Sequence, residues 1–146
     1  YGTHQFGMED QGWVAWFVIA ALRGAPLTVF GDGKQVRDVL WVDDLVRAYE
    51  AFLDRGPRQG VYNLGGGPEH TLSLRELLRQ LGARLGREVP IATGPWRPSD
   101  QKVYVSDISK ASRELGGRPE TSPSQGVDLL IDWVRANEGL FHHLGA

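Results

Sequence analysis

One arginine stands where a guanidinium could hold an anion. Arg37 lies between a glycine-flanked turn at 31–33 and an apolar run at 39–42. Its planar fork of N–H donors suits a carboxylate or a phosphate. Because Asp38 follows directly, a structural ion pair between neighbours is an equally good interpretation. The residue types indicate an anion partner for Arg37 and leave its identity open.

A second arginine occupies a loop. Arg97 precedes Pro98 within the polar segment 96–101, and a residue before proline is held in an extended conformation. An extended, semi-rigid arginine is suited to bidentate capture of phosphate oxygens. The same composition is also typical of an ordinary surface loop. Nothing in the spacing alone says whether Arg37 and Arg97 meet.

The elements around Arg37 follow from local signals. Gly31 and Gly33 tolerate the positive φ of a tight turn, and the apolar run 39–42 predicts a short buried strand. Either Asp43 or Asp44 is placed to cap a helix that continues to Asp54. The pattern therefore predicts turn, strand and helix in quick succession.

The rest of the chain predicts alternating helices and short strands. Ser73 and Glu76 form a capping box. We expect helices at 13–23, at 74–85, from 106 to a stop at 116–117, and at 123–136, and strands at 27–30, 61–64, 89–92 and 103–105. The loop 55–60 and a frayed tail from 138 to 146 complete the expectation. The fold class is α/β, with short strands and about five helices.

Composition excludes several classes of function. The 146 residues carry a net charge of −2 without a basic run, so neither nucleic acid nor a membrane surface is an expected partner. The longest apolar run, 13–22, is too short to span a bilayer. There is no cysteine, and adjacent His142 and His143 near the end of the chain do not predict a metal site.

Two motifs resemble a known family. The residues Gly31-Asp32-Gly33, Arg37-Asp38 and Val42-Asp43-Asp44 look like a signature of the extended short-chain dehydrogenases/reductases, the NAD-dependent nucleotide-sugar epimerases and dehydratases. The run from Gln5 through Gln11-Gly12-Trp13-Val14 to Phe17 is similar to the CDP-paratose/CDP-tyvelose 2-epimerase branch. The resemblance extends from about Tyr1 to Val134 and implies the C-terminal, substrate-binding part of a Rossmann-type enzyme.

The resemblance also implies which residues touch substrate. Arg37 and Arg97 would bind the diphosphate of a nucleotide sugar, and Asp100 would accept hydrogen bonds from ribose hydroxyls. Further candidates are Asn63 for the phosphates, Thr28 and Phe30 for the base, and Gln11, Trp13 and Val14 beside the nucleotide. Each has a plainer interpretation: Asn63 ties down a turn, and the apolar residues belong to the core.

Chemistry in this family needs parts that this sequence lacks. A glycine-rich turn seats NAD on a helix N-terminus, and a Tyr-x-x-x-Lys pair handles the proton; neither occurs here. We therefore expect no catalytic residue in this chain. Residues 1–138 would form the nucleotide-sugar domain and 139–146 a tail of a truncated enzyme. The complete enzyme would be a cytoplasmic homo-oligomer, such as a dimer, with NAD bound by the missing half.

Other classes stay open at this point. The chain could be a stand-alone nucleotide-sugar module, a self-associating non-catalytic fragment, or part of a sugar-nucleotide 4,6-dehydratase. Calorimetry with CDP and CDP-hexoses separates the first, because tight binding by the isolated chain favours a module. Sedimentation tests the second. The run around Gln11 and Trp13 favours a CDP-hexose substrate and 2-epimerisation.

Overall fold

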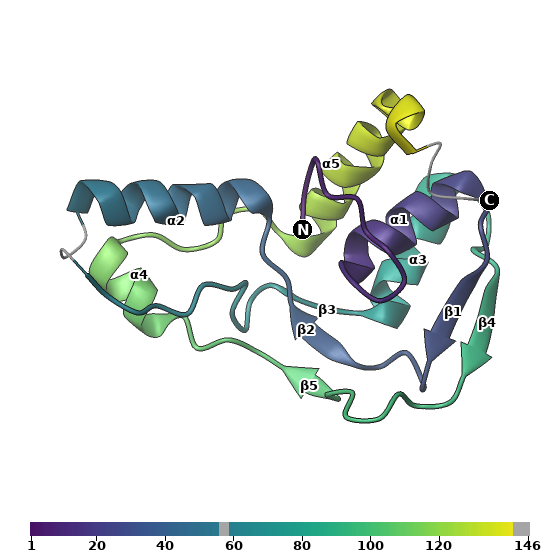
Figure 1. Cartoon of the computed structure of the whole chain (residues 1–146), viewed down its shortest axis with the longest axis horizontal. Coiled ribbons are helices and arrows are strands. Elements are labelled where there is room, and N and C mark those ends of the chain that lie inside the picture. Colours follow the sequence, from purple (N-terminus) through teal and green to yellow (C-terminus); the bar gives the residue numbers. More distant parts are fainter. Residues whose placement is uncertain (56–58, 142–146) are drawn as a thin grey trace.

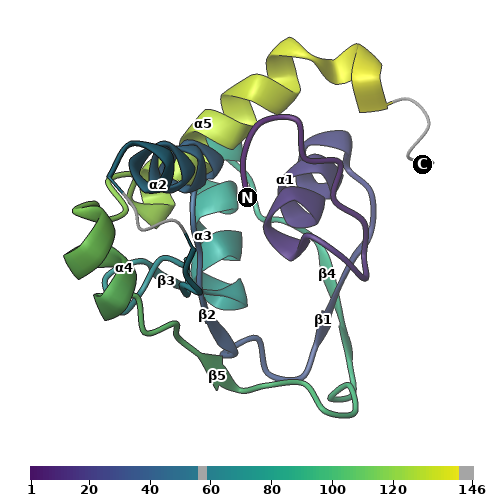
Figure 2. The ribbon, with the colours of Figure 1, turned by 60° about the vertical axis from the view of Figure 1, so that its left-hand side comes forward.

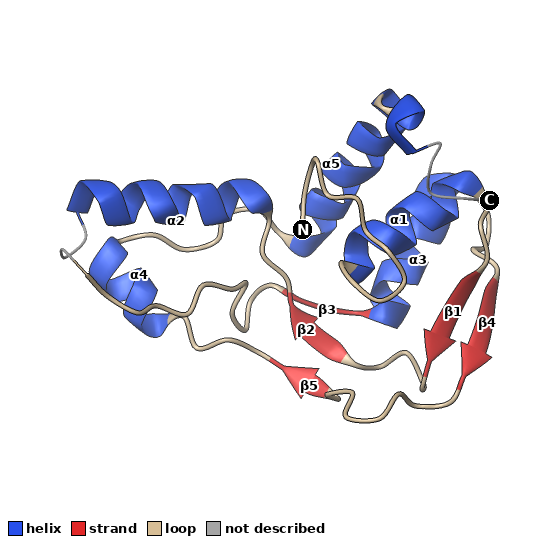
Figure 3. Cartoon of the chain, in the orientation of Figure 1, coloured by secondary structure: helices blue, strands red, loops and turns tan. Residues whose placement is uncertain are grey.

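The computed structural model describes residues 1–55 and 59–141. In chain order the elements are α1 (Trp13–Arg23), β1 (Leu27–Phe30), β2 (Val36–Asp38), α2 (Val42–Arg55), β3 (Thr71–Ser73), α3 (Leu74–Leu85), β4 (Ile91–Gly94), β5 (Val103–Tyr104), α4 (Ser109–Leu115), α5 (Pro123–Ala136) and the 3₁₀ helix η1 (Glu138–Phe141). Figure 3 shows these helices and short strands. The predicted α/β class with about five helices is confirmed for the described residues.

The strands form two separate small sheets, which two connections join at their ends (Figure 2). In one, β1 pairs in parallel with β4, and in the other, β2 lies between antiparallel β3 and parallel β5. Both connections, 31–35 and 95–102, therefore run from the first sheet to the second in the same direction. Hydrogen bonds from the Gly31 amide to the Gly94 carbonyl (3.0 Å) and from the Val36 amide to the Lys102 carbonyl (2.9 Å) hold their ends together. This pairing brings two segments 60 residues apart next to each other.

The hydrophobic core lies where α1, α3 and α5 pack together, at one end of the molecule, while α2 and α4 lie at the other (Figure 1). Ile19, Leu77 and Leu130 are fully buried there, one from each helix. Burial of such side chains contributes about 1.5–3 kcal/mol each. No helix among the described residues is long and apolar enough to cross a membrane.

The helix predictions are confirmed where local signals were strong. Helix α1 ends at Gly24 in the left-handed conformation (φ 69°), and α4 ends in the same way at Gly116. Helix α5 begins with Pro123 after the capping residue Ser122, and it spans the predicted residues. The predicted tail starts with a turn of 3₁₀ helix, and Phe141 is buried there. His142 and His143 lie outside the described residues.

The predicted strand at 39–42 is wrong. Its backbone bonds go to two separate segments and form no continuous ladder. The Val39 amide donates to the His70 carbonyl (2.8 Å), and the Val42 amide donates to the Tyr1 carbonyl (2.9 Å). The Leu40 carbonyl accepts from the Tyr1 amino group (2.8 Å), and α2 already begins at Val42. The Trp41 indole N–H donates to the Asp43 carboxylate, which turns the chain into the helix. Contrary to the prediction, neither Asp43 nor Asp44 is the residue before the helix, because α2 begins at Val42 and both lie in its first turn. Val39 and Trp41 are buried as expected, and Leu40 and Val42 are half-buried. Burial alone does not create the backbone pairing of a sheet.

Two further strand predictions need correction. Residues 61–64 are not a strand: Val61 is 85% exposed, and its carbonyl accepts from the Lys110 ammonium at 2.8 Å. An alternating pattern forms a strand only beside another strand, and none of the described ones flanks this segment. The edge strand predicted at 89–92 occurs at Ile91–Gly94, after Pro90, which lacks a ladder donor. Part of the predicted loop, 56–58, lies outside the described residues.

The capping box of α3 gives a testable contribution to stability. The Ser73 hydroxyl and amide both bond to the Glu76 carboxylate (2.6 and 2.8 Å), which lowers the pKa of Glu76 from its ordinary 4.5. A carboxyl with a depressed folded-state pKa stabilises the fold above pH 4.5 and loses this effect as the pH falls. Ser73→Ala should therefore cost about 1 kcal/mol at pH 7 and less at pH 3 in urea unfolding. Ser73→Thr, which keeps the hydroxyl, should cost little at either pH; equal costs for both variants would contradict this account.

Candidate functional site

The two connections between the sheets border a cleft of about 160 Å³. It lies between the N-terminal part of α1, strand β1, strand β2 with Arg37 and the loop that carries Arg97. Six of the nine predicted site residues line it: Trp13, Thr28, Phe30, Arg37, Arg97 and Asp100. The structure therefore brings both arginines, the acid and the aromatic residue to one place.

Arg37 is paired across the cleft and not with its neighbour. Its Nη2 lies 2.9 Å from Oδ1 of Asp100, and its Nη1 donates to the Val36 carbonyl. Asp38, the partner that adjacency suggested, instead accepts from the Gly67 amide at 3.0 Å. Both Arg37 and Asp100 side chains are 23% exposed, so one edge of the pair faces the solvent. The sequence neighbour was the wrong ion-pair partner.

Arg97 lies over the ring of Phe30, with 4.0 Å from the guanidinium carbon to the ring centroid. Two acids of the loop before α1 approach it: Asp10 Oδ1 at 3.2 Å and Glu9 Oε1 at 3.9 Å. A turn with Ser99 at φ 64° directs Asp100 back toward the cleft, and the Asp100 amide donates to the Arg97 carbonyl at 3.2 Å. In this structure each arginine is thus neutralised by carboxylates of the chain itself.

The loop that carries Trp96 and Arg97 packs directly against Gly31. Gly31 has φ 79°, and a Cβ at this position would lie 2.6 Å from the Trp96 ring. Any larger residue would push Trp96, and with it Arg97, away from β1. The predicted glycine turn is confirmed, and its role includes the close approach of the second loop.

Removal of the two acids beside Arg97 should slightly increase the affinity of the cleft for an anionic ligand. They compete with any anionic ligand for the guanidinium, but they are solvent-exposed, so each pair is worth little. Asp10→Asn combined with Glu9→Gln should tighten binding of an anion such as CDP by about two- to fivefold in calorimetry. Glu88→Gln combined with Glu138→Gln, two exposed acids outside the cleft, is the control for the same change of net charge. Weaker binding in the double variant would contradict this competition.

Three predicted residues lie elsewhere. Val14 is buried and lines a separate cavity of about 780 Å³ that shares Trp13 with the cleft. Gln11 is exposed, and its backbone bridges to Met8. The Asn63 amide donates to the Asp107 carbonyl at 3.4 Å, so it joins the segment before α4 and not its own turn.

The cleft also contains residues that the sequence prediction missed. They are Glu9, Trp16, Phe17, Gln35 and Leu74. The sequence contains a signal for two of them. Gln35 precedes Arg37 by two positions and thus shares its side of an extended chain. Trp16 lies about one helical turn after Trp13. Nothing in the sequence indicates that Glu9 would meet Arg97.

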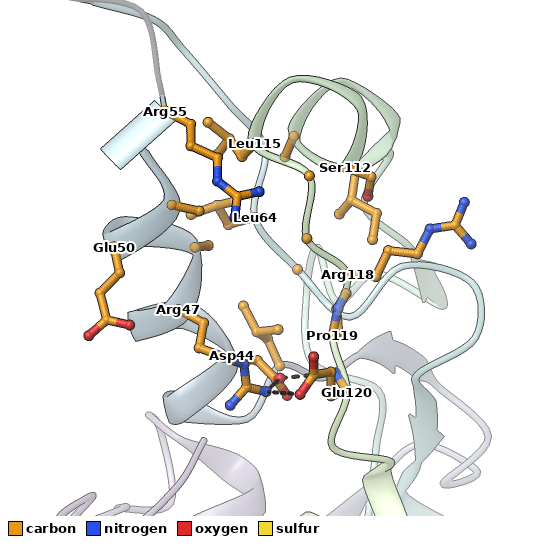
Figure 4. A pocket seen from close by; sticks show the side chains of 18 of the residues that line it. Asp44, Arg47, Glu50, Arg55, Leu64, Ser112, Leu115, Arg118, Pro119 and Glu120 are labelled. Atoms are coloured by element: carbon orange, nitrogen blue, oxygen red, sulfur yellow. Dashed lines mark hydrogen bonds and ion pairs between the residues drawn. The ribbon is translucent and has the colours of Figure 1, made fainter. Parts of the chain in front are cut away.

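Another cavity, of about 310 Å³, lies between α2, α4 and the segment 115–120 (Figure 4). Three of its charged residues, Asp44, Arg47 and Glu120, interact with one another. The Asp44 carboxylate accepts from the backbone amides of Glu120 (2.9 Å) and Thr121 (3.1 Å), and Arg47 bonds to both Asp44 and Glu120. We interpret this cluster as the lock that holds the segment 118–121 against α2.

Among the described residues, the glycine-rich turn of a dinucleotide site for NAD is absent. A dinucleotide site needs a glycine-rich turn that leads from a strand directly into a helix N-terminus. The turn after β1 leads into β2 instead, and the helix that follows Gly12 begins after a loop. Nor does any tyrosine stand four residues before a lysine. No chemical step that uses the cofactor is assigned to these residues.

Comparisons with known proteins agree with the motifs. Residues 1–65 match the model of the NAD dependent epimerase/dehydratase family. The chain is 37% identical to CDP-paratose 2-epimerase of Salmonella typhi, over 92% of this chain and 42% of that protein. It is 36% identical to a dTDP-glucose 4,6-dehydratase of Xanthomonas campestris pv. campestris, over 94% and 41%. The chain thus spans about two fifths of the length of these curated relatives.

Solved structures of similar enzymes share the fold. UDP-glucose 4-epimerase of Thermotoga maritima, solved with UDP-glucose, has a TM-score of 0.83 at 32% identity and covers 94% of this chain, which covers 44% of that one. UDP-glucuronic acid 4-epimerase of Bacillus cereus, solved with UDP-glucuronic acid and NAD, has a TM-score of 0.79 at 29% identity, with coverages of 93% and 42%. The fold of the chain matches part of these Rossmann-type enzymes. Motifs, fold and similarity together identify the chain as a member of the NAD-dependent epimerase/dehydratase family.

Proposed function

We propose that the cleft binds the diphosphate of a nucleotide sugar. The observation that carries this proposal is the convergence of Arg37 and Arg97, 60 positions apart, on one cleft beside Phe30. Charge-assisted hydrogen bonds from two guanidinium groups are strong and directional. A pyrophosphate would replace Asp100 at Arg37, and Glu9 with Asp10 at Arg97.

The replacement of these carboxylates by the pyrophosphate would also open the binding site for the nucleoside. When Arg97 leaves the Phe30 ring, that aromatic face becomes available for stacking with a base. Thr28 on the same strand offers its backbone carbonyl and amide groups for hydrogen bonds to the edge of the base. Asp100, released from Arg37, accepts from a ribose hydroxyl. In the absence of ligand, the chain's own charged groups occupy the positions that the ligand's groups would take.

We further propose that the chain, through residues 1–138, is the C-terminal substrate-binding part of an NAD-dependent CDP-hexose 2-epimerase. The similarity to CDP-paratose 2-epimerase supports this substrate. NAD and the proton-transfer residues would belong to the remainder of that enzyme, so the isolated chain should be inactive. Substrate binding far from the reacting carbon would then fix the sugar for chemistry done by other residues. A cytoplasmic homo-oligomer is the expected form.

Calorimetry with the chain tests the cleft assignment. CDP should bind, and cytidine, which lacks the diphosphate, should bind at least tenfold more weakly because it meets neither arginine. Equal affinities for CDP and cytidine, or no binding of CDP, would overturn the proposal. The similarity to a dTDP-glucose 4,6-dehydratase supports one alternative, which predicts that dTDP binds more tightly than CDP.

A further inference from the structure

One side chain of the cleft has an unused acceptor. Gln35 is only 8% exposed, and its Nε2 donates to the Phe30 carbonyl at 2.7 Å and lies 3.3 Å from Asp100 Oδ2. Both neighbours can only accept while Asp100 is ionised, so they fix the orientation of the amide. Within residues 1–55 and 59–141, the Oε1 atom of Gln35 is buried and has no hydrogen-bond partner.

A buried acceptor without a partner destabilises the free protein, and a ligand that supplies a donor relieves this cost. The diphosphate of a nucleotide sugar cannot do so, because both of its phosphates are diesters and carry no proton to donate near neutral pH. The missing partner must therefore be an O–H or an N–H group. Gln35 lines the same cleft as the arginines, so a ligand held there can supply this donor in place of a solvent molecule.

The position of Gln35 narrows the choice of donor. It is bonded to Phe30, the proposed face for the base, and to Asp100, whose other oxygen holds Arg37. In a nucleoside diphosphate, the ribose is the part between base and phosphates. Asp100 and Gln35 present two neighbouring acceptors at this level, which matches the two adjacent hydroxyls of a ribose.

We propose that the Gln35 side-chain oxygen accepts a hydrogen bond from one ribose hydroxyl while Asp100 accepts from the other. This inference rests on the proposed function of the cleft and adds a selectivity to it: the site prefers ribonucleoside over deoxyribonucleoside diphosphates. The Gln35 oxygen is covered in this structure, so entry of the ligand must displace side chains of the cleft, including Arg97 over Phe30.

The test compares CDP with 2′-deoxy-CDP and 3′-deoxy-CDP by calorimetry. The unmodified chain should bind each analogue about five- to tenfold more weakly than CDP, the loss typical of one hydrogen bond. Gln35→Met, which keeps the volume but removes the acceptor, should bind CDP more weakly and reduce the discrimination against one analogue to within twofold. Unchanged discrimination against both analogues in Gln35→Met would overturn the inference.

A second variant keeps the test decisive if Gln35→Met does not fold. Asp100→Ala leaves Gln35 bonded to Phe30, so discrimination against one analogue should persist. Loss of discrimination against both analogues would show that Asp100 reads the ribose alone and would overturn the role of Gln35. Failure of the proposed function looks different, because the unmodified chain would then not bind CDP at all.

Discussion

Arg37→Ala is expected to weaken CDP binding by about 10- to 100-fold. The guanidinium offers charge-assisted hydrogen bonds, which contribute about 1.5–3 kcal/mol each, and 1.4 kcal/mol corresponds to a factor of ten. The variant also leaves the Asp100 carboxylate without its partner at 2.9 Å, next to the incoming phosphates. Calorimetry with CDP measures the loss.

Two variants make this result specific. Arg37→Lys keeps the charge but loses the planar fork, so its affinity should lie between those of the unmodified chain and Arg37→Ala. Arg84→Ala is the matched control. Like Arg37, Arg84 is paired with carboxylates, here those of Asp128 and Asp132, but it lies outside the cleft. A CDP affinity unchanged in Arg37→Ala, or reduced equally in Arg84→Ala, would show that Arg37 does not bind the phosphate.

Asp44→Ala should be the most destabilising single change that we predict, at about 2–4 kcal/mol. Its buried carboxylate satisfies two backbone amides, those of Glu120 and Thr121, and pairs with Arg47 (Figure 4). Removing it leaves two donors without partners and frees the segment 118–121 from α2. The free energy of unfolding in urea measures the effect.

Controls on the same helix separate this lock from general helix effects. Glu50→Ala changes an exposed carboxylate of α2 and should alter the stability by less than about 0.5 kcal/mol. Arg47→Ala leaves the amide bonds to Asp44 intact and should cost clearly less than Asp44→Ala. A loss for Asp44→Ala no larger than that for Glu50→Ala would refute the lock.

The helices were predicted well because the residues that start and end a helix lie within a few positions of each other in the sequence. Ser73 and Glu76 define the start of α3, and Gly24 and Gly116 define the ends of α1 and α4. Strands depend on partners that are distant in sequence. The apolar run at 39–42 and the segment 61–64 had the right residues, but neither lies along another described strand.

The candidate site shows the same division. Arginine chemistry and the family motif singled out Arg37 and Arg97, but only the parallel pairing of β1 with β4 and of β2 with β5 brings them together. The missed Gln35 is a further example. Its unused acceptor exists only because the Phe30 carbonyl and Asp100 occupy the other side of the amide, and no sequence pattern encodes this.

The central claim is that both arginines bind one diphosphate, and a crystal structure of the chain with CDP tests it most directly. We expect guanidinium nitrogens of Arg37 and Arg97 at about 2.7–3.0 Å from pyrophosphate oxygens, with the cytosine against Phe30. CDP in another cavity, with Arg37 still paired to Asp100 and Arg97 still over Phe30, would contradict the claim.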